Sequence, residues 1–212
     1  MKDWGVLFYD VTTMLSLILL GISLLIGGVR FFSFSKGQKW FLYYLGFDFI
    51  TEMISKLLIF FHQGNLFLYP FYISGEFILL STMFIVELKL SRKWFVFSGL
   101  ISVYLFSESF FLWMFHHNVS SGIGKILSHL IIVCMVGYYF IHTLKTFENE
   151  KRNRSLLIYG CLFLYYVSSI FLFLLLDQLS TMSRCNASVI WGMNNALSCV
   201  LYGVSSYTFL RS

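Results

Sequence analysis

Ionisable side chains interrupt the second of the long apolar stretches in the sequence. Between Trp40 and Phe61, the acids Asp48 and Glu52 and the base Lys56 recur at intervals of four residues. On an α-helix this spacing places the three side chains on one face, with Glu52 and Lys56 in the order that favours an ion pair. Charged groups inside a membrane span cost about 2.5–3.5 kcal/mol each and usually mark functional sites. We therefore predict that these three residues belong to a functional site.

Other apolar stretches carry polar side chains at a similar depth. Glu76, Glu108 and His129 lie between the middle of a predicted span and its outer end, and Tyr69 begins the third span. This asymmetry predicts an outward-open polar cavity among the second, third, fourth, fifth and seventh spans. The candidate ligand-binding residues are Asp48, Glu52, Lys56, Tyr69, Glu76, Glu108, His129, Asn194 and Asn195.

The balance of charges within the spans favours such a cavity. Lys56 is the only permanent cation expected there, whereas the predicted spans hold the acids Asp10, Asp48, Glu52, Glu76 and Glu108. A buried carboxylate without a cation becomes neutral, or it borders water or a bound cation. The alternative is that these polar groups are structural and hold neighbouring helices together.

The histidines and cysteines predict no metal and no cofactor. His62, His116 and His117 fall in expected outer loops, and they lack the helical spacing or the cysteine motif that a zinc site requires. The four cysteines are scattered along the chain. We expect those within spans to pack as small apolar side chains.

The composition shows where these polar residues must lie. The chain has 212 residues, of which 58% are hydrophobic and 12% are charged, and its mean hydropathy is +0.78. A soluble domain carries about 25% charged residues, so the polar side chains here are too few to cover a water-facing surface. The net charge of +5 is divided among short clusters without a nucleic-acid-binding motif. The expected partner is therefore the lipid bilayer, and no nucleic acid is expected.

Seven apolar stretches are long enough to cross a bilayer as helices, which takes about 20 residues each. They lack the alternation that strands of a membrane barrel show. We therefore predict an all-α, polytopic membrane bundle of seven transmembrane helices, which forms a single domain over residues 1–212. The predicted spans are Val6–Gly28, Trp40–Phe61, Leu66–Leu88, Trp94–Phe115, Ile126–Leu144, Leu156–Leu176 and Ala187–Leu210.

The distribution of lysine and arginine predicts the orientation of these spans. Eleven basic residues fall on one side of the predicted bundle, and the three on the other side are Lys2, Lys125 and Arg184. The positive-inside rule places the richer side in the cytoplasm. We therefore predict an outer N-terminus and a cytoplasmic C-terminus in a bacterial inner membrane.

Two short motifs resemble those of a known group of proteins. Asn65-x3-Tyr69-x6-Glu76-Phe77 enters the third span, and Trp191-x2-Asn194-Asn195 lies in the seventh. In these motifs the chain is similar to small seven-span membrane proteins of Bacteroidota and to the membrane domains of sensor kinases. The resemblance implies that the polar residues form a ligand-sensing pocket, and it indicates no particular ligand.

Three functions are compatible with these residues. The first is a receptor-like or sensory module that binds a small polar or lipid ligand, mainly through Glu52, Lys56 and Glu76. Since no output domain follows the seventh span, we expect its signal to pass to a partner signalling protein at the cytoplasmic face. The second is a membrane-embedded lipid hydrolase with Asp48 and Glu52 as general acid and base. The third is a proton- or cation-coupled carrier that uses the carboxylates as a relay.

Overall fold

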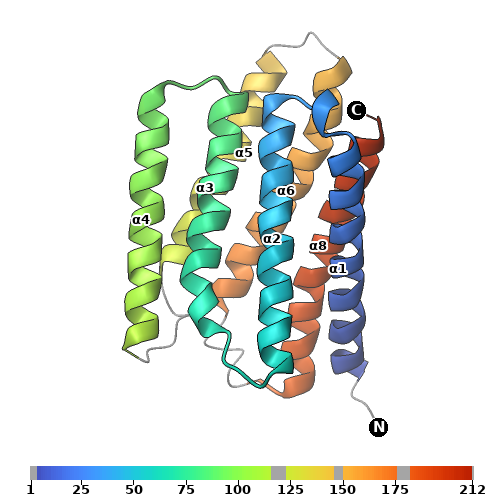
Figure 1. Cartoon of the computed structure of the whole chain (residues 1–212), viewed down its shortest axis with the longest axis vertical. Coiled ribbons are helices and arrows are strands. Elements are labelled where there is room, and N and C mark those ends of the chain that lie inside the picture. Colours follow the sequence, from blue (N-terminus) through green and yellow to red (C-terminus); the bar gives the residue numbers. More distant parts are fainter. Residues whose placement is uncertain (1–3, 116–122, 146–149, 176–181, 212) are drawn as a thin grey trace. The chain divides into compact units, whose positions relative to one another are not determined.

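The computed structural model describes residues 4–115, 123–145, 150–175 and 182–211 (Figure 1). Within these ranges the chain is all-α and has seven α-helices and two short 3-10 helices. Each predicted span coincides with one α-helix, and the ends differ by a few residues. The elements are α1 (Trp4–Val29), η1 (Phe31–Ser33), α2 (Lys36–Phe60), η2 (Leu66–Leu68), α3 (Tyr69–Glu87), α4 (Arg92–Met114), α5 (Ile123–Lys145), α6 (Glu150–Leu174) and α8 (Arg184–Arg211).

Five segments of the described chain are long and apolar enough to cross a membrane. They lie in α1, in η2 with α3, in α4, in α5 and in α6. The helices α2 and α8 are of similar length, with 25 and 28 residues, but they are more polar. These properties define a helical, multi-pass membrane protein.

Local sequence signals account for several helix ends. The Ser35 hydroxyl accepts a hydrogen bond from the Gln38 backbone N–H, and the Gln38 side chain accepts one from the Ser35 backbone, which is a capping box at the start of α2. Pro70 lies in the first turn of α3. Proline is tolerated there because a backbone N–H in the first turn would not donate to another residue of the helix. His62 and Lys89 follow α2 and α3 with φ angles of 57° and 52°. A residue in this left-handed conformation closes the end of a helix.

The helices belong to two compact units. One unit comprises residues 1–33 and 136–212, and the other comprises residues 34–135, so that α5 contributes to both. In the first unit, α1 lies along α8, and α6 also packs against α8 (Figure 1). In the second unit, α3 lies between α2 and α4 and contacts both.

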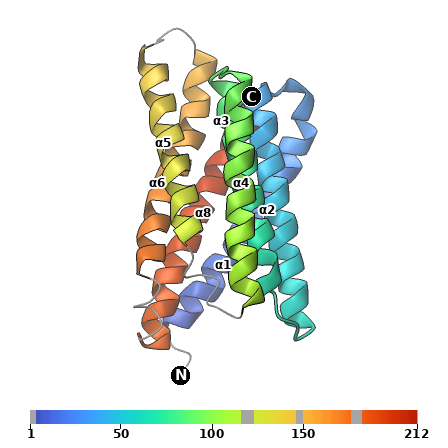
Figure 2. The same cartoon turned by 90° about the vertical axis from the view of Figure 1, so that its left-hand side faces the viewer.

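Small and aromatic side chains join the helices of the first unit. The Ser23 hydroxyl of α1 donates to the Tyr202 carbonyl oxygen of α8 at 2.7 Å and lies 2.7 Å from the Ser206 hydroxyl. Figure 2 shows α5 and α6 running side by side. Tyr139 of α5 packs against Tyr159 of α6, with ring centroids 4.2 Å apart. Small residues that allow close approach, with hydrogen bonds between helices, are typical of helix contacts in membranes.

The core of the second unit is centred on α3. Phe77, Leu80 and Met83 are fully buried there. A Cβ atom added at Gly75 would collide with Cζ of the Phe47 ring on α2 and would lie 2.8 and 2.9 Å from its Cε2 and Cε1. The lack of a side chain at Gly75 therefore allows α2 to approach α3 closely beside Glu76. This close contact holds α2 against the part of α3 that carries the candidate site.

Candidate functional site

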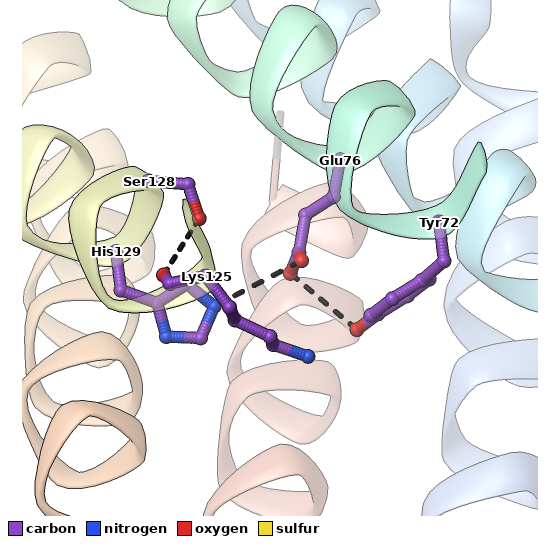
Figure 3. Close-up of polar contacts among 5 residues, drawn as sticks. All are labelled: Tyr72, Glu76, Lys125, Ser128 and His129. Atoms are coloured by element: carbon purple, nitrogen blue, oxygen red, sulfur yellow. Dashed lines mark hydrogen bonds and ion pairs between the residues drawn. The ribbon is translucent and has the colours of Figure 1, made fainter. Parts of the chain in front are cut away.

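Polar side chains of the second unit gather around Glu76, in the first half of α3. Glu76 is only 2% exposed. One helical turn earlier, Tyr72 donates a long hydrogen bond of 3.5 Å from its hydroxyl to Glu76 Oε1. His129 of α5 approaches the same carboxylate, with Nε2 3.9 Å from Glu76 Oε2 (Figure 3). This distance is too long for a hydrogen bond, so the contact is an ion pair when the imidazole is protonated.

Lys125 is a member of this cluster that the sequence did not predict. It lies in the first turn of α5, within the candidate span Ile123–Thr143, and it is 8% exposed. Its position in an outer loop was therefore a wrong prediction, and so was the expectation that Lys56 is the only cation within the spans. The cause is that the continuous apolar run begins at Ile126, whereas the helix begins three residues earlier.

Two tyrosine rings lie next to the Lys125 ammonium group, and two acids interact with it electrostatically. Lys125 Nζ lies 5.3 Å from the ring centroid of Tyr69 and 4.8 Å from that of Tyr72. Aromatic rings within about 6 Å of a cation attract it. Glu76 and Asp48 are the carboxylates whose negative charges act on the ammonium group. These interactions offset the cost of placing a charge in an apolar environment.

Asp48 and Glu108 bring two more helices to this region. Asp48 on α2 is 5% exposed. Glu108 on α4 packs against Gly124 at the start of α5, where an added Cβ atom would collide with its carboxylate. Glu108 Oε2 is buried and has no hydrogen-bond partner among the described residues. The negative charges of Glu76 and Glu108 both act on Tyr69.

The structure therefore unites several predicted residues in one place. The buried cluster, as we call it below, consists of Asp48, Tyr69, Tyr72, Glu76, Lys125 and His129. Its residues come from α2, α3 and α5. All six of them lie in the second unit. Tyr72 and Lys125 are the two members that were absent from the predicted set.

A small open pocket adjoins the buried cluster. Its volume is about 170 Å³. Tyr69 and Tyr72 belong to both the pocket and the cluster. We call it the α2–α3 pocket, and its lining residues are Thr51, Glu52, Ser55, Asn65, Leu66, Leu68, Tyr69 and Tyr72.

The predicted ion pair between Glu52 and Lys56 is wrong. No ion pair or hydrogen bond joins the two side chains in the described structure; Glu52 is exposed and lines the pocket, whereas Lys56 is half-buried outside it. The four-residue spacing permits this pair, but such a pair contributes only about 0.2–0.5 kcal/mol, which is too little to fix two long side chains. Asp48 is buried whereas Glu52 is exposed, so the two acids that the hydrolase hypothesis pairs lie in different environments.

Asn194 and Asn195 lie on α8, in the first unit. Asn195 Nδ2 donates to the Thr13 hydroxyl of α1 at 2.7 Å, which is a contact that holds two helices together. Asn194 Oδ1 is buried and has no hydrogen-bond partner within the described ranges. Neither asparagine is among the residues that form the buried cluster or the α2–α3 pocket.

The described residues contain no group of three or more His, Cys, Asp or Glu side chains that could hold a metal ion. His116 and His117 lie outside the described residues. Comparison of the chain with protein-family models, with curated proteins and with solved structures finds no match. The observations that bear on function are therefore those of a multi-pass membrane protein in which a buried charged cluster adjoins a polar pocket.

Proposed function

We propose that the protein is a receptor-like sensory membrane module, which binds a small ligand in the α2–α3 pocket and signals through a partner protein. The observation that carries this proposal is the double role of Tyr69 and Tyr72. Both line the pocket, and both place their rings next to the buried Lys125 ammonium group. A ligand in the pocket therefore contacts the side chains that surround a buried charge.

The energetics of the cluster favour a sensor. A ligand shifts a conformational equilibrium only by its difference in affinity for the two states, and a tenfold difference corresponds to about 1.4 kcal/mol. Displacing either tyrosine ring changes the attraction between that ring and Lys125, which is worth about 0.5–2 kcal/mol. Contacts of this size are sufficient for a ligand to change the populations of two arrangements of the helices.

We further propose that all seven helices cross the membrane, with the N-terminus outside and the C-terminus in the cytoplasm. The lengths of α2 and α8, 25 and 28 residues, are sufficient for a bilayer. Lys36, Lys89 and Arg92 are exposed at the ends of α2, α3 and α4 that this orientation places in the cytoplasm. The α2–α3 pocket then lies in the outer half of a bacterial inner membrane, and the exposed basic residues are where a partner protein would dock.

The partner is tested by site-specific photocrosslinking of the full chain in its native membrane. A photoreactive residue at Lys89 should crosslink to a second protein, whereas the same residue at Gln63, at the other end of the helix pair, should not. The substitution Tyr72→Leu, which removes the ring next to Lys125, should change the yield of the Lys89 crosslink. Tyr72→Phe keeps the ring and serves as the matched control.

Three outcomes would overturn the sensory proposal. The first is a Lys89 crosslink yield that is the same in the wild type and in Tyr72→Leu. The second is turnover of a membrane lipid by the purified protein that is lost in Asp48→Asn, which would identify a hydrolase. The third is proton or cation flux into vesicles that contain the protein, which would identify a carrier.

A further inference from the structure

We propose that the α2–α3 pocket binds a primary ammonium group attached to a short apolar body. This inference rests on the proposed function and names the chemical class of the ligand. Its first support is the charge of the pocket. Glu52 is the single charged side chain among the lining residues, and neither lysine, arginine nor histidine lines the pocket. An acidic lining attracts a cation and disfavours an anion.

The hydrogen bonds within the lining determine which kind of cation fits. Asn65 Nδ2 donates to the Ser55 hydroxyl at 2.7 Å, and the Thr51 hydroxyl donates to the Phe47 carbonyl oxygen at 2.8 Å. These bonds use one N–H of Asn65 and the O–H of Thr51, while the Asn65 carbonyl oxygen, the Thr51 hydroxyl oxygen and the Glu52 carboxylate can accept hydrogen bonds. A primary ammonium group has three donors and no acceptor, so its hydrogen bonding complements this lining. A quaternary ammonium has no donor and would leave these acceptors unused.

The two tyrosine rings that line the pocket already contact an ammonium group of the protein itself, which is not part of the pocket lining. Tyr69 and Tyr72 hold Lys125 Nζ at 5.3 and 4.8 Å from their ring centroids. The electron-rich face of an aromatic ring attracts a cation whether it belongs to the chain or to a ligand. In the pocket the same two rings lie with the Glu52 carboxylate, whose charge offsets the repulsion between a bound ammonium group and Lys125 Nζ.

Size and polarity limit the rest of the ligand. The pocket of about 170 Å³ is completed by Leu66 and Leu68, which offer an apolar surface to a short alkyl or aryl group. A primary ammonium group attached to an apolar body can come from two sources, a free amine or the headgroup of phosphatidylethanolamine. Both present the same primary ammonium, so the test separates them through the lipid composition.

The test is a binding measurement by isothermal titration calorimetry on the full chain in nanodiscs of phosphatidylcholine and phosphatidylglycerol. Phenethylamine is the probe, 2-phenylethanol is its neutral counterpart, and trimethyl(phenethyl)ammonium is its quaternary counterpart. Phenethylamine should bind, and the other two compounds should bind more weakly. Nanodiscs that also contain phosphatidylethanolamine form a second arm, in which competition with phenethylamine identifies the lipid headgroup as a ligand and its absence identifies a free amine.

Two variants and one control make the result specific to the pocket. Glu52→Gln keeps the size of the side chain and removes its charge, so phenethylamine should bind about tenfold more weakly. Asn65→Asp adds a second carboxylate to the lining, so binding should become tighter. Asp10→Asn is the matched control, because Asp10 is an exposed carboxylate on α1 that does not line the pocket. Its binding should equal that of the wild type.

The proposal is overturned if 2-phenylethanol binds as tightly as phenethylamine. It is also overturned if neither Glu52→Gln nor Asn65→Asp changes the affinity. Such a result would leave the sensory proposal intact, provided that the crosslink at Lys89 still responds to Tyr72→Leu. Conversely, amine binding with an unresponsive crosslink would retain the ligand class and overturn the sensory proposal.

Discussion

A double-mutant cycle on Lys125 and Glu76 measures directly whether the buried cluster contributes to stability. Lys125→Met removes the buried cation with which the charges of Glu76 and Asp48 interact. Leaving a buried charge without its compensating charge costs about 3–5 kcal/mol. Glu76→Gln should cost less, about 2–3 kcal/mol, because Asp48 continues to act on Lys125.

The combined variant decides between coupled and independent residues. If Lys125 and Glu76 interact, the free energy of unfolding of the double variant should be about 1–2 kcal/mol higher than the sum of the single losses predicts. The assay is reversible unfolding of the full chain by titration with sodium dodecyl sulfate in mixed micelles, followed by tryptophan fluorescence. Lys56→Met combined with Glu76→Gln is the matched control, because Lys56 lies outside the cluster. The energetic role of the cluster would be refuted if the stability loss of the double variant of Lys125 and Glu76 equalled the sum of the two single losses to within about 0.5 kcal/mol.

Three further predictions use the same unfolding titration. Gly75→Ala should lower the free energy of unfolding by about 1–3 kcal/mol because its Cβ atom meets an α2 ring, whereas Gly99→Ala, which has open space around it, should raise it slightly. An equal effect at both positions would contradict the close α2–α3 contact. Lys89→Gly should raise the free energy by about 1 kcal/mol because it relieves a φ angle of 52°; a loss would contradict this reason. Ser23→Ala should lower it by about 1 kcal/mol through lost hydrogen bonds to α8, and more than Ser16→Ala, whose hydroxyl bonds within its own helix.

The helices were predictable because membrane spans have a strong and simple signal. Long apolar runs separated by short polar connections indicate where a chain can satisfy its backbone hydrogen bonds in lipid. Differences arise at the ends, as in α2, which begins at Lys36 rather than near Trp40. There the capping box at Ser35 decides where the helix starts, and a hydropathy window does not detect a cap.

Residues of the candidate site were predictable only where they interrupt an apolar run. Glu76 and His129 do so, and the structure brings them together. Lys125 was assigned to the preceding connection because hydropathy alone places a lysine at the edge of a run in water. A signal for its true position existed in the spacing, since Lys125 and His129 are four residues apart and would share one face of a helix that starts earlier.

Side-chain partners were less predictable than positions. The spacing of Glu52 and Lys56 is compatible with an ion pair, but spacing on one helix carries no information about what a neighbouring helix offers. Tyr69 and Tyr72 of α3 and Asn65 of the preceding connection create a pocket beside Glu52, and these contacts arise from tertiary packing. Likewise, the sequence placed Asn195 at the depth of the cavity without indicating that its partner is Thr13 of α1.

Lys125 changes how the acids of the spans are to be understood. The excess of acids over bases in the predicted spans led us to expect one polar, water-accessible cavity that holds these acids with a cation. In the structure Asp10 is exposed on α1, while Asp48 and Glu76 act on a lysine of the chain itself. The cation is thus already supplied inside the cluster, whereas Glu52, in the pocket, forms no ion pair with a lysine, arginine or histidine among the described residues. The region therefore consists of two sites, a built-in charge cluster and an acidic pocket, and Tyr69 and Tyr72 are the two side chains through which one can act on the other.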